Sequence, residues 1–216
     1  MLLLWSLLVA CVPPTIVGVR TDGYLAPAGS LEFSAGYGGS LPALDLAAAD
    51  PVGVPAGEVA WSATDDVQVS VGAAFPEGWV MPGAEIMVRV IGAEDTPVDF
   101  AVLTGVGGIF SGEPATLGQV GVHVGGVVSV EAVPDLRPFV GAVGAVAFAE
   151  GEPSVFGEAS LGIGWRPKVS DEVSLLFLAE AAWIHGSDLA DEAQWTYDAL
   201  SAAGMAGLTW NPKKGE

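Results

Sequence analysis

The chain has 216 residues, of which 51% are hydrophobic and 15% are charged, and its formal net charge at pH 7 is −19. Nucleic acid is excluded as a partner, because so acidic a chain cannot neutralise phosphates. Beyond residue 10 no stretch approaches about 18 consecutive apolar residues, so we expect no transmembrane helix. A single hydrophobic domain without such a helix is either a soluble protein with a large core or a transmembrane β-barrel.

The chain begins with an uncharged apolar run. Residues 1–10, MLLLWSLLVA, contain no Pro or Gly and end in small residues, which is typical of an export signal peptide and too short to span a bilayer. Cys11, the single cysteine, follows directly, so no intramolecular disulfide is possible. The sequence LVAC at residues 8–11 resembles the lipobox of bacterial lipoproteins. This resemblance implies cleavage before Cys11 and lipidation of its thiol; a free cysteine buried in a first strand is the alternative.

The rest of the chain divides into a tether, a β-domain and a short tail. Residues 11–29 are irregular and contain Pro and Gly, so we expect them to form a lipidated tether. From residue 30 to 212 apolar and polar residues alternate between turn residues, which predicts β-strands, and residues 213–216 form the tail. The expected strands are residues 30–38, 57–63, 67–75, 82–92, 98–110, 116–130, 136–148, 155–166, 172–184 and 204–211.

The two faces of these strands differ in an unusual way. One face carries large apolar residues, and the other carries mostly Gly, Ala and Ser with scattered charges, which suits the interior of a narrow closed barrel better than a solvated surface. We therefore predict an all-β, antiparallel, up-and-down transmembrane barrel of about ten strands, with eight as the alternative. The expected lumen charges are Glu32, Glu58, Glu85, Arg89, Asp99, Glu158, Arg166 and Glu180. The expected aromatic girdle at the membrane boundaries is Trp61, Phe75, Phe110, Trp165, Trp183 and Trp210.

Charge and loop length indicate an orientation for such a barrel. If both termini lie at one end, all seven basic residues fall near that end, together with the short turns. The longest connections, 39–56 and 185–203, then lie at the other end with only acidic charges. Short turns beside the termini and longer loops opposite are typical of barrels whose termini are periplasmic. The turns in question are residues 64–66, 93–97, 131–135 and 167–171.

Two hairpin sequences carry a resemblance to a known class. WSATDDVQVSVGAAF (61–75) and WRPKVSDEVSLLF (165–177) resemble the strand–turn–strand units of small bacterial outer-membrane β-barrels, and the resemblance extends over roughly residues 30–211. It implies a location in the outer membrane of a Gram-negative bacterium, with periplasmic termini. The partners it implies are outer-membrane lipid and the barrel-assembly and lipoprotein-sorting machineries.

Few residues suggest chemistry. His123 lies among glycines on the expected lumen face, where a hydrogen-bonding role is favoured over catalysis or metal binding. His185 and Asp188 are the candidates for a catalytic pair at the level of the loops, although groups in an acidic loop are more often solvated. Residues 189–203 favour a loop over a short amphipathic helix. We predict no enzyme activity, no cofactor and no metal site.

The lumen charges separate the functional hypotheses. We expect Arg89 and Arg166 to pair with acidic neighbours such as Asp99 or Glu32, which would fill the lumen. The first hypothesis is a non-enzymatic outer-membrane barrel lipoprotein with a structural, surface-interaction or narrow-channel role. The second is a soluble periplasmic or surface lipoprotein whose β-barrel or sandwich binds an apolar ligand. The third is a barrel enzyme that uses one of the two histidines.

Overall fold

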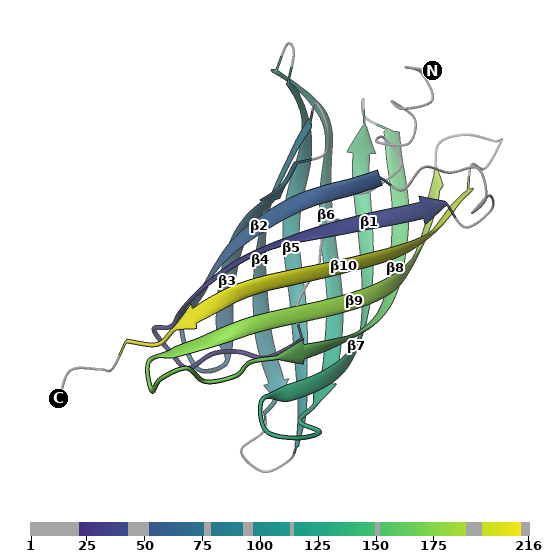
Figure 1. Cartoon of the computed structure of the whole chain (residues 1–216). Helices are drawn as coiled ribbons and strands as arrows, with labels where there is room; N and C mark the ends of the chain where they lie inside the picture. Colours follow the sequence, from purple (N-terminus) through teal and green to yellow (C-terminus); the bar gives the residue numbers. More distant parts are fainter. Residues whose placement is uncertain are drawn as a thin grey trace.

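The computed structural model describes residues 22–42, 52–75, 79–92, 97–112, 115–149, 152–188 and 196–212. These residues form a closed antiparallel barrel of ten strands, in which each strand pairs with its neighbours in the sequence and β1 pairs with β10 (Figure 1). The predicted up-and-down barrel is thus confirmed, with ten strands rather than eight. The strands are β1 (Leu31–Pro42), β2 (Val52–Ser62), β3 (Val67–Ala74), β4 (Trp79–Ile91), β5 (Val98–Gly112), β6 (Ala115–Val130), β7 (Leu136–Ala149), β8 (Glu152–Trp165), β9 (Val173–Asp188) and β10 (Thr196–Trp210).

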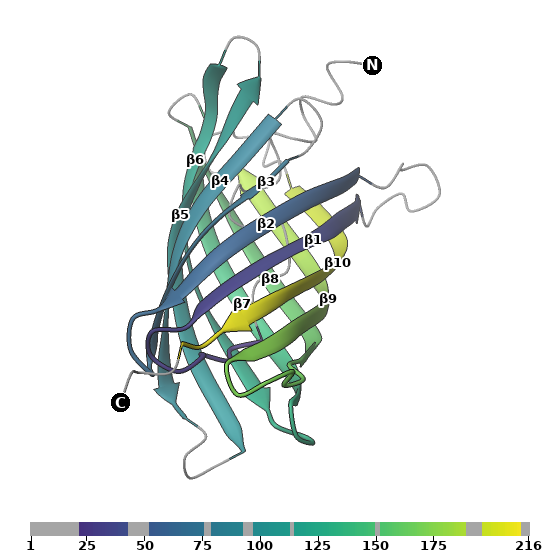
Figure 2. The ribbon, with the colours of Figure 1, turned by 60° about the vertical axis from the view of Figure 1, so that its left-hand side comes forward.

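Pairing between the first and last strands closes the ring. Leu31 in β1 lies opposite Trp210 of β10 on one side and opposite Trp61 of β2 on the other. Figure 2 shows β1 between these two strands. Every described strand therefore has a partner on both sides, and where both neighbours pair with it the backbone N–H and C=O groups need no water. In the part of the chain that the structure describes, no helix is long and apolar enough to cross a membrane.

Two strands extend well beyond their predicted limits. β2 begins at Val52 instead of residue 57, and β10 begins at Thr196 instead of residue 204. The expectation of a loop or short helix over 189–203 is wrong for residues 196–203, which pair with Glu180 to Ser187 of β9; residues 189–195 lie outside the described residues. The alternation in this segment is weak, and pairing with strands on both sides outweighs the local pattern.

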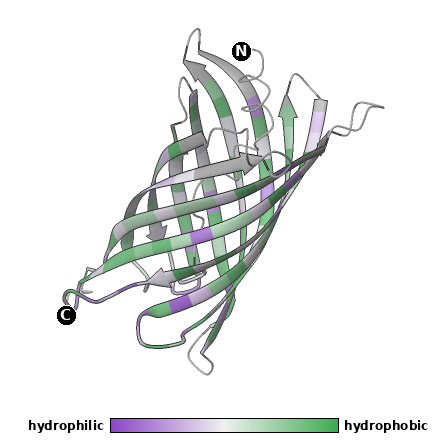
Figure 3. Cartoon of the chain, turned by 45° about the vertical axis from the view of Figure 1, so that its right-hand side comes forward, coloured by the Kyte–Doolittle hydropathy of each residue, from purple (hydrophilic) through white to green (hydrophobic). Residues whose placement is uncertain are grey.

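The alternation of the sequence becomes an outer and an inner face. Outward positions carry exposed apolar side chains such as Val71, Val124 and Leu161, which are 56%, 59% and 64% exposed. Hydrophilic and hydrophobic residues accordingly alternate along the strands in Figure 3. Leu176 and Leu178 break the polar pattern of the inner face of β9; both are buried in a cluster of lumen side chains.

Residues 22–30 are called the N-terminal plug below, and their first part, residues 22–26, lies inside the barrel. Asp22, Leu25, Ala26 and Ser30 are each at most 3% exposed. The expected tether is therefore wrong for residues 22–26, which are buried in the lumen, whereas Pro27 and Gly29 are exposed; residues 11–21, with Cys11, lie outside the described residues. Two glycines allow the plug to bend, since Gly23 and Gly29 have φ angles of 74° and 87°, a region that favours glycine.

Glycines on the inner face make room for large lumen side chains. A Cβ atom at Gly162 of β8 would overlap the ring of Phe139 and lie 2.5 Å from the carbonyl oxygen of Ala179. A Cβ atom at Gly157, on the outer face of the same strand, would meet nothing within 4 Å. On β8, the inner-face glycine is thus closely packed and the outer-face glycine is not.

We expect Gly162→Ala to destabilise the folded barrel by about 1–3 kcal/mol, because Phe139 and the backbone of β9 must move to accept a methyl group. Gly157→Ala is the matched control on the same strand and should change stability by less than about 0.5 kcal/mol. Urea unfolding of both variants in detergent, followed by tryptophan fluorescence, measures the difference. Equal effects of the two substitutions would contradict this packing.

Candidate functional site

Three arginines converge at the end of the lumen where the short turns lie. Arg89 is two residues from the end of β4, Arg137 is the second residue of β7, and Arg166 directly follows β8. All three contact carboxylates, and Arg137 and Arg166 are only 7% and 6% exposed. Buried guanidinium groups are tolerated when they are paired and hydrogen-bonded, so this end of the lumen is an ionic layer.

Arg166 joins the plug to the barrel wall. Its Nε and Nη2 donate to the two carboxylate oxygens of Asp22 at 3.0 and 2.9 Å, and its Nη1 donates to Glu32 in β1. The hydroxyl of Thr209 in β10 also donates to Glu32, at 2.9 Å. Burial lowers the pKa of Arg166, but Asp22 and Glu32 raise it by more, so the guanidinium stays charged. Arg166 therefore links the plug to the first strand, and Glu32 links the first strand to the last.

Tyr24 fills the space between two of the arginines. Its ring centroid lies 5.0 Å from the guanidinium carbon of Arg137 and 4.6 Å from that of Arg166, which are cation–π distances. Burial raises the pKa of the Tyr24 phenol above its ordinary value, and the neighbouring guanidiniums of Arg166 and Arg137 partly oppose this rise. The phenol therefore remains neutral while it stacks against two positive charges.

Main-chain contacts hold the remainder of the plug at the same end. Nη2 of Arg89 donates to the carbonyl oxygen of Leu25 at 2.9 Å. The amide of Ala28 donates to Asp65 at 2.8 Å, and the amide of Gly29 donates to the carbonyl oxygen of Ser62 at 2.7 Å. The plug is thus attached to β4 and to the turn between β2 and β3, as well as to β8.

Arg137 and Arg89 share the buried carboxylate of Asp99. Arg137 binds Asp99 directly and donates to Glu131 at 2.7 Å, and Nε of Arg89 lies 3.7 Å from Asp99. Arg89 also lies 3.7 Å from Asp66. The expected pairings of Arg89 with Asp99 and of Arg166 with Glu32 are both confirmed. Asp22, Tyr24 and Arg137 were not among the predicted lumen residues.

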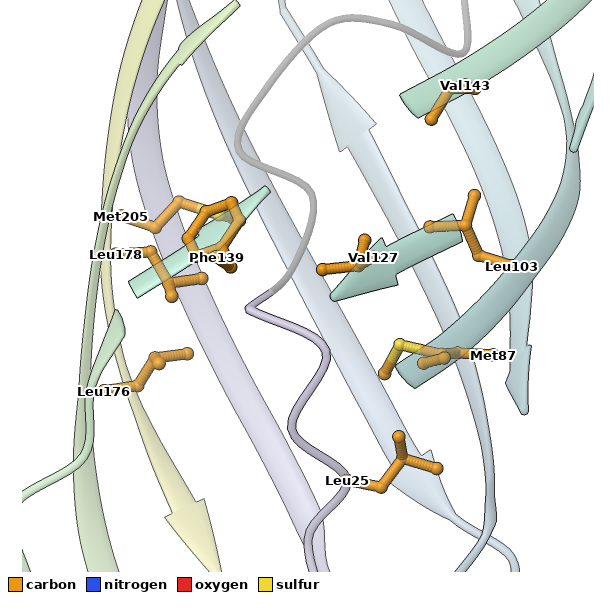
Figure 4. Close-up of a cluster of buried hydrophobic side chains, with 10 residues drawn as sticks. Leu25, Met87, Leu103, Val127, Phe139, Val143, Leu176, Leu178 and Met205 are labelled. Atoms are coloured by element: carbon orange, nitrogen blue, oxygen red, sulfur yellow. The ribbon is translucent and has the colours of Figure 1, made fainter. Parts of the chain in front are cut away.

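The lumen also contains a cluster of buried apolar side chains. Leu25 of the plug packs in one cluster with buried side chains of β4, β5, β6, β7, β9 and β10. In Figure 4 Leu176, Leu178, Phe139 and Met205 lie on one side of the view, and Met87, Leu103 and Val127 on the other. Among the described residues, the plug and these wall side chains therefore fill this level of the lumen. The wall residues of this cluster are Met87, Ala101, Leu103, Val127, Phe139, Val143, Leu176, Leu178 and Met205.

The other predicted lumen charges lie on the inner face. Glu32, Glu58 and Glu85 line one small polar cavity, together with Gln68 and Ser70. About 10 Å³ of this cavity is available to the centre of a water molecule, which is room for about one water. Glu158 in β8 and Glu180 in β9 are also buried, at 7% and 8% exposure.

His123 is a lumen residue with an acidic partner. Its Nε2 lies 2.8 Å from Glu85 in β4, and its side chain is 5% exposed. Gly105 in the adjacent strand leaves room for the ring, because a Cβ atom there would lie 2.5 Å from the imidazole. The predicted hydrogen-bonding role of His123 is confirmed.

His185 is paired with a carboxylate that was not predicted. It lies on the outer face of β9, and its Nδ1 is 2.8 Å from Asp198, its cross-strand neighbour in β10. The side chain of Asp188 lies outside the described residues. The two histidines occupy opposite faces of the wall, so they form no common site. Within the described ranges, no group of three His, Cys, Asp or Glu residues is placed to hold a metal ion.

The predicted girdle residues are all exposed on the outer face, at 39–50%. Trp165 and Trp210 end β8 and β10 at the turn end, and Trp61 is the last residue but one of β2. Trp165 stacks on Phe177 with 5.4 Å between ring centroids. Phe75 directly follows β3, and Phe110 and Trp183 lie toward the end of β5 and β9 away from the turns. The outer face therefore has aromatic residues near both ends.

The chain is similar to several solved structures but matches no known family. No protein-family model and no curated protein matches the chain. Among solved structures, the β-domain of the Bordetella autotransporter BrkA covers 86% of this chain and 100% of its own, with 10% identity and a TM-score of 0.45. An outer membrane channel from Pseudomonas putida F1 covers 89% and 99%, with 10% identity and a TM-score of 0.45. The outer membrane protease OmpT from Escherichia coli covers 88% and 99%, with 8% identity and a TM-score of 0.40.

We expect Arg137→Met to destabilise the barrel by about 3–5 kcal/mol, because it leaves the buried Asp99 carboxylate without its closest cation. The double variant Arg137→Met/Asp99→Asn should be less destabilised than the sum of the two single variants. Urea unfolding of the four proteins gives the coupling free energy. Strict additivity would show that the two side chains do not stabilise each other.

Proposed function

We propose that this chain is a non-enzymatic integral β-barrel of the bacterial outer membrane, closed by its N-terminal plug, with a structural or surface-interaction role. The observation that supports this most strongly is the inverted polarity of the barrel. Large apolar side chains cover the outside, whereas ion pairs and carboxylates lie inside. A barrel that folds in water has the opposite arrangement, and exposed apolar patches on soluble monomers rarely exceed a few hundred Å².

The outer face is almost free of charge. Among the outward strand residues whose side chains are described, Asp198 supplies the single carboxylate, there is no Lys or Arg, and Asp198 contacts His185. Both residues lie near the end of their strands away from the short turns. A solvated β-sheet would carry charges along its whole length, whereas hydrocarbon excludes them.

The height of the apolar band suits a bilayer. On β10, outward residues from Leu200 to Trp210 are apolar or glycine. These ten intervals measure about 33 Å along the strand at about 3.3 Å per residue, or about 25 Å along the membrane normal at a tilt of about 40°. Outer-membrane barrels have an apolar band about 25 Å tall, flanked by aromatic residues.

The filled lumen favours a structural role over the alternatives. Among the described residues, the plug and the wall side chains occupy the interior and the cavity beside Glu85 holds about one water, which does not favour an apolar ligand. A steady channel would need a continuous water-filled path, which the plug, bound to Arg166 through Asp22, interrupts. Neither histidine lies beside a described Ser or Cys nucleophile in a hydrogen-bonded pair, so the contacts offer no support for catalysis.

The N-terminal anchor completes this proposal. Cys11 is acylated, residues 11–21 form the tether, and the turn end of the barrel faces the periplasm together with both termini. Asp22 lies near that end, and the eleven Cα–Cα intervals from Cys11 to Asp22 span at most about 40 Å, enough to reach the periplasmic leaflet. The partners are then outer-membrane lipid and the machineries that assemble barrels and sort lipoproteins.

A charge placed on the outer face tests which solvent surrounds it. We expect Val124→Lys, in the middle of β6, to destabilise the barrel in lipid by about 2–4 kcal/mol. Val133→Lys, in the β6–β7 turn, is the matched control, because the two valines are 59% and 53% exposed in the same protein. Unfolding in phospholipid vesicles measures both. If Val124→Lys is as harmless as Val133→Lys, the outer face is solvated and the protein is a soluble barrel.

Gel mobility tests closure and anchoring together. We expect the unboiled protein from outer-membrane extracts to migrate faster than the boiled protein, because a closed barrel resists unfolding by detergent. Metabolic labelling with a radioactive fatty acid should mark the wild type, and Cys11→Ala should lose the label yet stay in the membrane fraction. Mobility that is indifferent to boiling, with a soluble Cys11→Ala protein, would instead support a lipoprotein with an ordinary apolar core.

A further inference from the structure

We propose that the N-terminal plug is a displaceable gate, and that its release opens a narrow cation-selective path through the barrel. This inference rests on the proposed membrane function, because only a barrel embedded in lipid separates two aqueous compartments. It goes beyond that function, since it assigns a conducting state to a barrel whose described state is closed.

The arginines of the wall keep ion pairs with wall carboxylates when the plug leaves. Arg166 binds Asp22 of the plug, but it also binds Glu32 of the wall. Arg137 keeps Asp99 and Glu131, and Arg89 keeps Asp99. Each arginine therefore retains a wall carboxylate, and departure of the plug leaves no buried guanidinium without a counter-charge, the condition that makes breaking a buried pair costly.

The plug is held in the barrel mainly by polar contacts. Its described contacts are mostly polar: an ion pair at Asp22, cation–π contacts at Tyr24, and hydrogen bonds at Leu25, Ala28 and Gly29. Water can replace each of them. The contribution of the plug to the apolar cluster of the lumen is Leu25, whereas nine residues of that cluster belong to the wall. A segment held in this way exchanges with solvent more readily than a paired strand.

The side chains that line the lumen carry an excess of negative charge. Six carboxylates of the described wall face the lumen, together with three guanidiniums. Arg89, Arg137 and Arg166 lie at the turn end, whereas Glu58, Glu85, Glu158 and Glu180 lie four or more residues inside their strands from that end. The deeper lumen is thus acidic, and rings of carboxylates favour cations over anions in pores. The six carboxylates are Glu32, Glu58, Glu85, Asp99, Glu158 and Glu180.

Planar-bilayer recording in KCl tests the gate with the full-length chain. We expect the wild type to give no steady conductance, and Asp22→Ala/Tyr24→Ala to give lasting conductance steps. In a KCl gradient the reversal potential of the variant should move toward the Nernst potential of K⁺. Glu85→Gln in the same background should reduce that displacement. The matched control is Asp171→Ala/Tyr37→Ala, which removes the same two side-chain types from an exposed turn and from the outer face.

Each outcome bears on the proposal. A double variant that keeps its heat-dependent gel mobility but never conducts would show that the wall alone closes the lumen, and the gate would be wrong. Conductance without preference for K⁺ over Cl⁻ would overturn the cation path. Steady conductance of the wild type would overturn the closed barrel of the proposed function itself. If the double variant does not fold, Asp22→Asn, which keeps the shape of the side chain and weakens the ion pair, takes its place with the same expected result.

Discussion

The pairing of β1 with β10 is the interaction on which the rest of the structure depends. Twelve residues of β1, Leu31 to Pro42, pair with Trp210 to Ala199 of β10 and convert a sheet into a ring. Because a ring has no edge, every strand can satisfy its backbone without water, and the outer face is then free to be entirely apolar. Glu32 and Thr209 place a side-chain hydrogen bond across this same seam, and Arg166 binds Glu32 from the lumen.

A closed ring also imposes a constraint on its interior. Ten strands enclose a space too narrow for large side chains at every position, yet too wide to leave empty. The chain meets this constraint by placing glycines of the barrel wall next to large or charged side chains in the lumen. Phe139 lies against Gly162, His123 against Gly105, and Asp22 of the plug against Gly164. The glycines of the inner face therefore leave room for particular large or charged side chains.

Period-two alternation was sufficient to predict the barrel, its order of strands and its inner carboxylates, because alternation is a local property that closure does not change. It also located Arg89 and Arg166 and two of their partners. Arg137 was missed, because residues 138–148 are apolar on both faces and alternation does not assign the preceding residue to the lumen. The start of β10 was missed as well, because residues 196–203 alternate weakly and become a strand only through their partners on either side.

The plug lay beyond sequence reasoning for a different reason. Asp22 and Tyr24 stand in an irregular segment, and nothing local distinguishes them from a solvated tether. Their partners, Arg137 and Arg166, are more than a hundred residues away in the chain. Only the closed barrel brings these groups together, so long-range contacts rather than the local sequence pattern determine where residues 22–30 lie.

This separation has a consequence for how the protein assembles. The plug is synthesised before every strand, yet Arg166, which binds Asp22 across 144 positions, follows the eighth strand. The plug therefore cannot be seated until most of the barrel exists, and contacts of such long range form late because loop closure opposes them. Burial of Tyr24 is thus a marker of completed assembly: a barrel intermediate caught before closure would leave this side chain in water, open to chemical labelling that the finished protein resists.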